Sequence, residues 1–181
     1  MKKLSAILLA LALTLCLTAC GEGEATLAAT EGPTEAAYGI ANPWTDSDAA
    51  ALEAMLGSAR FSVPEGAENV IYRALEAAKL AEIRFSIDGM DYTARIQPAG
   101  AATDISGMYY DNWGDDEPCT IGGIEGMSHR ATDGDKTIDV CQWYDAANGM
   151  MYSLSAEGAD LDGFDIVAIA EAVYGAAQPD A

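Results

Sequence analysis

The chain is short of positive charge. Its 181 residues include nine Lys and Arg against 29 Asp and Glu, with a single His, for a formal net charge of -20. Because proteins bind nucleic acids largely through Lys and Arg contacts to phosphates, this composition excludes a nucleic-acid partner. Aromatic residues make up only 8% of the chain. Beyond the amino-terminal run, no stretch has the roughly 18 consecutive apolar residues of a membrane-spanning helix.

The amino-terminal residues have the pattern of an export signal. Lys2 and Lys3 precede an apolar run from Leu4 to Leu17, and the run is followed closely by Cys20. This run is shorter than the roughly 20 apolar residues that a permanent membrane helix needs. The sequence therefore predicts a signal peptide over residues 1–19.

The four residues that end at Cys20, LTAC, match the lipobox, so the chain resembles a bacterial lipoprotein. The resemblance implies that Cys20 receives a diacylglyceryl thioether, carrying chains such as palmitate, and that cleavage occurs just before it. Two acyl chains suffice for stable attachment to a bilayer, since each buried methylene contributes about 0.8 kcal/mol. We expect the mature protein on the outer, extracytoplasmic face of the cell membrane. An ordinary secretory signal with a coincidental Cys is the alternative.

Composition divides the rest of the chain into a tether and a domain. Residues 20–41 hold the lipidated Cys and a disordered acidic tether, because Gly, Ala, Thr and Pro are mixed there with four Glu and no basic residue. Residues 42–181 have the pattern of a single globular domain, long enough to bury roughly two thirds of its unfolded surface.

The domain is predicted to be α+β. We expect an antiparallel, largely meander-like sheet, with a short N-terminal helix and a C-terminal helix packed on one face. The N-terminal helix ends at Gly57, and the C-terminal helix begins at Asp162. Strands are expected over residues 61–63, 69–75, 81–87, 90–96, 117–121, 125–132, 136–144 and 150–155. Residues 98–118 form an irregular connection with one helical turn near residues 106–110.

The dipeptide Asp88-Gly89 is the strongest turn signal in the chain, because it is typical of a two-residue hairpin. It pairs Phe85 with Tyr92 on the core face. On the other face it pairs Glu82 with Arg95, an ion pair worth a few tenths of a kcal/mol if it is exposed.

Cys119 and Cys141 are the two Cys residues of the domain. In an exported protein the pair predicts a disulfide. We expect the two strands that carry them to be neighbours, and the bridge to contribute roughly 3 kcal/mol. A redox pair usually has the spacing CxxC, and zinc needs more soft ligands than two Cys and one His, so both alternatives are weaker.

The lone His129 follows Ser128, and adjacent residues of a strand face opposite sides, so the two are not expected to act as base and nucleophile. We expect His129 at the surface or at an edge.

Three clusters of acidic residues contain carboxylates of the kind that calcium prefers. They are Asp111 with Asp115, Asp116 and Glu117; Asp133 with Asp135 and Asp139; and Asp160 with Asp162 and Asp165. They lack the ligand spacing of an EF-hand loop, so turn, capping and solubility roles are favoured, and neither a metal nor a cofactor is expected.

Tyr109, Tyr110 and Trp113 are the candidate binding residues, because they cluster within the irregular connection. Exposed aromatic side chains favour an envelope protein, a peptide or a glycan as partner. The alternative is that they form a lid over the sheet edge.

Several segments taken in order resemble a family of Gram-positive lipoproteins whose extracytoplasmic domains are uncharacterised, related in style to domains of some anti-sigma-factor-like membrane proteins. The segments are NPWTDSDAAALEAMLG, VPEGAENVIYRALEAAKLAEIRFSIDGMDYTARIQP, ISGMYY, VCQWYD and MYSLSAEGADLDGFD. The resemblance covers residues 42–175, implies location and fold, and supplies no catalytic residue. The sequence favours a non-enzymatic binding or envelope-sensing module. The alternative is an envelope hydrolase that uses two carboxylates about 5 to 10 Å apart.

Overall fold

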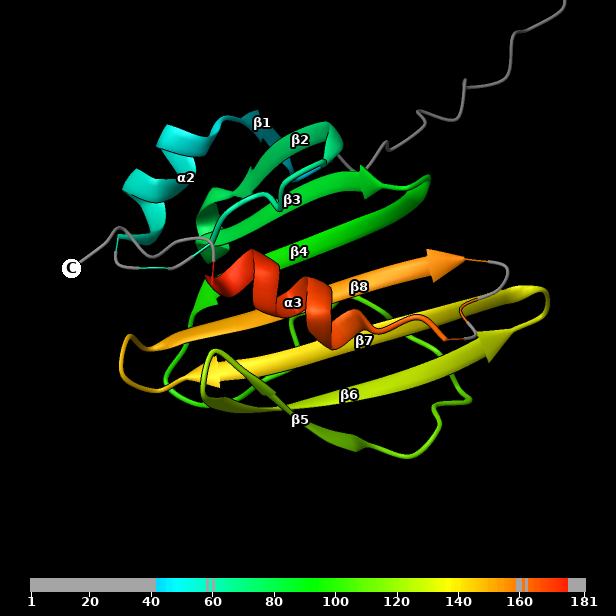
Figure 1. Ribbon diagram of the computed structural model, residues 1–181. Helices are drawn as coiled ribbons and strands as arrows, with labels where there is room; N and C mark the ends of the chain where they lie inside the picture. Colours follow the sequence, from blue (N-terminus) through cyan, green and yellow to red (C-terminus); the bar gives the residue numbers. More distant parts are fainter. Residues whose placement is uncertain (1–41, 58, 60, 159–160, 162, 176–181) are drawn as a thin grey trace, which may run out of the picture. The chain divides into compact units, whose positions relative to one another are not determined.

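The computed structural model describes residues 42–57, 59, 61–158, 161 and 163–175. The signal peptide and tether predicted for residues 1–41, including Cys20, lie outside the described residues, as do Asp160 and Asp162. The described part is mostly one open antiparallel sheet of eight strands with two α-helices, as Figure 1 shows, which confirms the mainly antiparallel class.

The eight strands lie in the order β1-β2-β3-β4-β8-β7-β6-β5. Their bounds are β1 Thr45–Ser47, β2 Glu68–Leu75, β3 Leu80–Ile87, β4 Met90–Pro98, β5 Glu117–Ile121, β6 Ile124–Asp133, β7 Lys136–Asp145 and β8 Met150–Gly158. The sheet therefore consists of two meanders, β1 to β4 and β5 to β8, joined where β8 pairs with β4. The prediction of a meander is correct within each half, but strand β1 was not predicted, and residues 61–63, predicted as a strand, do not form one.

The pairing of β4 with β8 places β5 at the far edge of the sheet, so the connection from β4 to β5 has to cross β8, β7 and β6. We call residues 99–116, which make this crossing, the strap. At its start Ala99 donates to the carbonyl of Gly149 at 2.9 Å, and near its end Gly114 donates to the carbonyl of Arg130 at 2.7 Å. The helical turn predicted near residues 106–110 is wrong, because these residues form no helix and the backbone N–H groups of Ser106 and Met108 donate to the side chains of Asp104 and Ser106 instead.

The predicted hairpin of β3 and β4 is confirmed in register. Phe85 pairs with Tyr92, and their rings stack with centroids 5.2 Å apart. Asp88 and Gly89 have φ values of 51° and 80°, as the two central residues of a type I′ turn require.

On the other face of this hairpin the Glu82 carboxylate is buried, so its ion pair with Arg95 is not the exposed pair for which a few tenths of a kcal/mol would hold. Glu82 is only 3% exposed and accepts hydrogen bonds from both Arg73 and Arg95, each at 3.0 Å. The Trp44 ring centroid lies 5.2 Å and 5.4 Å from these guanidinium carbons. The sequence-based pairing missed this cover, because Trp44 and the strap contact the arginine partners of Glu82 over long distances in sequence.

The two helices are α2, Ala49–Leu56, and α3, Ile166–Gly175, and a short 3-10 turn, η2, covers Glu76–Ala78. Asp48 caps α2 by accepting from the backbone N–H of Ala51 at 2.8 Å. Asp165 caps α3 by accepting from the backbone N–H of Val167 at 3.0 Å. Helix α3 thus begins at Ile166, later than the start predicted at Asp162.

Helix α3 contacts β5, β7 and β8, and α2 contacts β2. The core beside α3 is aromatic, because Trp143 stacks on Tyr152 at 5.1 Å and Tyr174 of α3 meets both rings edge-on. Leu52 of α2 and Ala170 of α3 belong to the same buried apolar cluster as these rings.

Asp145, at the end of β7, joins the β7–β8 turn to α3. Its carboxylate accepts hydrogen bonds from the side chain of Asn148 at 2.6 Å, from Tyr174 at 2.9 Å and from the backbone N–H of Ala147 at 3.0 Å. Burial by itself raises the pKa of this carboxyl, but these hydrogen bonds outweigh it and the pKa lies below its usual value.

Candidate functional site

The strap lies on the face of the sheet opposite α3. Successive residues of β7 show the division: Cys141 and Trp143 are buried in the core with α3, whereas Gln142 and Tyr144 donate hydrogen bonds to the strap. We call these the helix face and the strap face. The strap face carries a large hollow.

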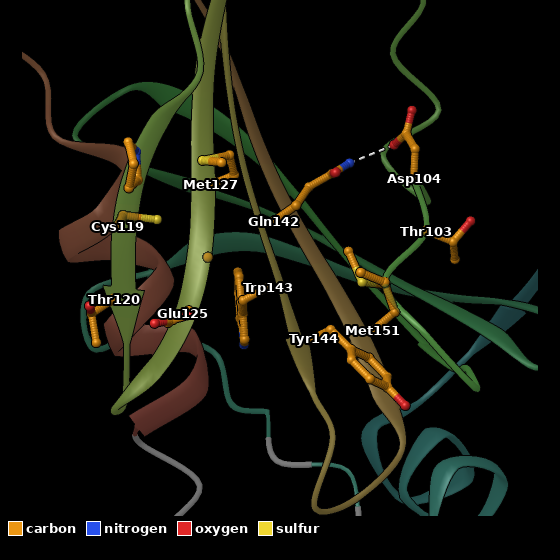
Figure 2. Close-up of a pocket in the computed structure, with 13 residues that line it drawn as sticks. Thr103, Asp104, Cys119, Thr120, Glu125, Met127, Gln142, Trp143, Tyr144 and Met151 are labelled. Atoms are coloured by element: carbon orange, nitrogen blue, oxygen red, sulfur yellow. Dashed lines mark hydrogen bonds between the residues drawn. The ribbon is translucent and has the colours of Figure 1, made fainter.

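This hollow is a groove with a cavity volume of about 720 Å³, between residues 102–104 of the strap and the edge strand β5. Figure 2 shows Thr103 and Asp104 on one side, Thr120 and Glu125 on the other, and Gln142, Tyr144 and Met151 between them. Its lining residues are Ala102, Thr103, Asp104, Pro118, Cys119, Thr120, Glu125, Gly126, Met127, Gln142, Trp143, Tyr144 and Met151.

Strand alternation builds the floor of the groove. Met127 of β6 pairs with Gln142 of β7, and Tyr144 pairs with Met151 of β8, so the four side chains point to the strap face. Met127 is 38% exposed, which is unusual for a large apolar side chain in this domain. The Tyr144 hydroxyl donates to the carbonyl of Ala99 at 3.1 Å and fixes the ring beside the strap.

Asp104 forms the wall. Its Oδ1 accepts from Gln142 Nε2 at 2.5 Å and from the backbone N–H of Ser106 at 2.8 Å. Burial works to raise the pKa of Asp104, but the hydrogen bonds from Ser106 and Gln142, with the nearby His129, hold it below its usual value. The groove therefore has an ionised carboxylate at one side at neutral pH, on a backbone fixed to the sheet.

The three predicted aromatic residues are only partly brought together. Tyr110 meets Trp113 edge-on at 5.6 Å, and Trp113 meets His129 edge-on at 4.8 Å, against the end of β6. Tyr109 does not join them and is 89% exposed. Tyr110 and Trp113 thus lie over the sheet edge, as in the lid alternative, while Tyr109 projects from the strap.

A second hollow, with a cavity volume of about 260 Å³, lies beside the first on the strap face. Its lining includes Trp113, Asp116 and His129, and it shares Asp104 and Gln142 with the groove. His129 Nδ1 lies 3.5 Å from Asp116 Oδ1. The contact between Asp104 and Gln142 therefore separates two neighbouring hollows.

A third hollow, of about 470 Å³, gathers residues from all three acidic clusters, Asp115, Glu117, Asp139 and Asp165. Two of these carboxylates already have structural partners. Asp139 accepts two hydrogen bonds from Arg130, at 2.6 and 2.7 Å, and Asp165 caps α3. The hollow brings acidic residues together, but half of them stabilise the fold.

The strands that carry the two Cys residues are not neighbours, which corrects the prediction. Cys119 lies on β5 and Cys141 on β7, with β6 between them. Their sulfur atoms nevertheless lie 3.7 Å apart, in contact but well beyond the about 2.05 Å of a disulfide. Both are thiols in this structure, so the bridge stays a prediction, and forming it requires β5 and β7 to approach each other.

Gly126 of β6 allows this contact. A Cβ at that position would lie 3.2 Å from the Cys119 sulfur and 2.8 Å from the carbonyl oxygen of Gln142. Burial raises the pKa of Cys119, and it raises that of the fully buried Cys141 far above its usual range. Neither thiol therefore has the low pKa of a reactive cysteine.

Within the described residues, no three His, Cys, Asp or Glu side chains are grouped as a metal site would require. The same part of the chain holds no helix with the length and apolar character needed to cross a membrane. No protein-family model, curated protein or solved structure matches the chain.

Proposed function

We propose that the chain is a membrane-anchored extracytoplasmic lipoprotein whose domain is a non-enzymatic binding or envelope-sensing module. The groove on the strap face is the observation that carries the binding role. Its volume of about 720 Å³ falls within the roughly 300 to 1,000 Å³ of small-ligand sites, and apolar floors with few polar groups are typical of such sites. The acyl chains on Cys20, in this proposal, hold the module at the membrane.

The hydrogen bonds of the strap support a groove that exists before a ligand arrives. The wall residue Asp104 is tied to Gln142 and to Ser106, and Ala99 is tied to Gly149 and Tyr144. A groove with fixed walls loses little entropy on binding. In the α+β arrangement that we propose, both helices cover the opposite face and leave the strap face to a ligand.

The alternative, an envelope hydrolase with paired carboxylates, finds its support in the hollow that holds Asp115, Glu117, Asp139 and Asp165. The ion pair of Asp139 with Arg130 and the capping role of Asp165 favour the binding module instead.

The anchor is tested by replacing Cys20 with Ala in the full-length protein. Because the thioether forms on the Cys20 sulfur, the Cys20→Ala variant is expected to lose all acylated product and to leave the membrane fraction. The measurement is cell fractionation with mass spectrometry of the amino terminus. Cys16→Ala, inside the predicted signal peptide, is the matched control and should still be acylated. A Cys20 that carries no acyl group in the unchanged protein, or a Cys20→Ala variant that is processed and acylated as before, would contradict the anchor.

A further inference from the structure

The charges around the groove restrict its ligand. Of the thirteen residues that line it, two are acidic, Asp104 and Glu125, and none is Lys, Arg or His. The two lie on opposite sides, one on the strap and one at the start of β6 (Figure 2). The groove thus presents carboxylates at both sides and no group that could neutralise an anion.

The net charge of the whole chain also disfavours an anionic ligand. A formal net charge of -20 produces a negative potential, and a cleft lined by one sign of charge concentrates ions of the opposite sign. An anionic ligand would meet repulsion on approach, and in the groove it would find carboxylates without a neighbouring Lys or Arg among the lining residues. Charge complementarity therefore favours a cation.

The side chains on the floor of the groove favour a ligand with an apolar part. Met127 and Met151 offer thioethers, which adapt to irregular apolar shapes. The Tyr144 ring lies on the same floor, and a quaternary or protonated amine is attracted to the face of such a ring. A small hydrated metal ion would use none of these groups.

From these contacts we propose that the groove binds a small amphiphilic ammonium ion, with its positive nitrogen near Glu125 or Asp104 and its apolar chain on Met127, Tyr144 and Met151. This inference rests on the proposed binding function, because it names the ligand class of the same groove. The adjacent hollow beneath Trp113 would be open to a longer ligand if the contact of Asp104 with Gln142 were broken.

The test is calorimetric titration of the purified domain with three probes of equal chain length below their micelle concentrations: decyltrimethylammonium, the neutral decyl glucoside and the anionic decyl sulfate. The ammonium should bind about tenfold more tightly than the glucoside, since a cation near two partly screened carboxylates gains on the order of 1.4 kcal/mol. The sulfate should bind least. Added salt should weaken only the preference for the ammonium.

Two variants change the charge of the groove, one at its side and one on its floor. Glu125→Gln should weaken ammonium binding about threefold to fivefold and leave glucoside binding unchanged, because Glu125 is exposed and contributes only charge. Met127→Lys should weaken ammonium binding more than tenfold, because it adds a cation to the floor. The matched controls Glu157→Gln and Ile71→Lys make the same changes of charge at exposed positions outside the groove, and should bind like the unchanged protein.

Equal affinities for the ammonium and the glucoside would overturn the inference that the ligand is a cation. If Met127→Lys then abolishes the binding of both probes, the proposed groove remains the binding site. Tighter binding of the sulfate, binding that Met127→Lys does not alter, or no binding of the ammonium would also overturn the inference.

Discussion

Replacing Glu82 by Gln is expected to lower the free energy of unfolding by about 3 kcal/mol, because it leaves two partly buried guanidinium groups without their carboxylate. Arg73 and Arg95 both donate to this side chain, which is 4% exposed. The two arginine side chains are 20% and 19% exposed. Water can therefore reach part of each guanidinium, which places the estimate at the lower end of the range for broken buried pairs.

The measurement is urea denaturation of the unchanged protein and the Glu82→Gln variant at neutral pH. Glu157→Gln is the matched control, since its exposed pair with Lys136 should contribute little to stability. Equal midpoints for Glu82→Gln and Glu157→Gln would show that the network of Arg73, Glu82 and Arg95 does not hold this face together.

Replacing Asp145 by Asn is expected to lower the free energy of unfolding by about 2 kcal/mol at pH 7, since hydrogen bonds to a charged group are worth more than neutral ones. Asn has one acceptor oxygen, so it cannot serve Asn148, Tyr174 and the turn backbone together. This loss would detach the β7–β8 turn from the end of α3.

The effect should depend on pH with a definite sign. The pKa of Asp145 is lowered in the folded protein, so its contribution is fully present above the unfolded pKa of about 3.9 and is lost as the pH falls through the folded value. The difference in stability between the unchanged protein and Asp145→Asn should therefore shrink below about pH 4. Denaturation curves at pH 7 and pH 3 measure it, and a difference that stays constant would refute the ionised role of Asp145.

Local patterns predicted the elements of this fold well, because they depend on neighbouring residues. Asp88-Gly89 gave the register of β3 and β4, and Gly57 gave the end of α2. Alternation along β7 and β8 is equally local, and it places Cys141 on the same face as its partner Leu154. The pairing of β4 with β8 could not be read in the same way, since it joins residues about sixty positions apart.

That missing pairing explains what the sequence did not reveal about the site. Without it, the strap had no defined path, and so Asp104 had no visible relation to Gln142 or Met127. Alternation along β7 does place Gln142 and Tyr144 on the face opposite Trp143, which was a usable signal for the groove floor. The three aromatic residues correctly indicated the strap as part of the site. The strap residues that line the groove are 102–104, however, and these precede Tyr109, Tyr110 and Trp113.

The most direct test of a ligand-binding groove on a membrane-tethered module is photo-crosslinking in intact cells from position 127, compared with position 71. Met127 and Ile71 are exposed apolar side chains of similar size, 38% and 47% exposed, and only Met127 lies in the groove. A photoreactive residue at each position reports what contacts it. If the groove binds a ligand, position 127 is expected to give a specific adduct, identified by mass spectrometry, and position 71 none. Adducts from neither position, or the same adducts from both, would contradict it.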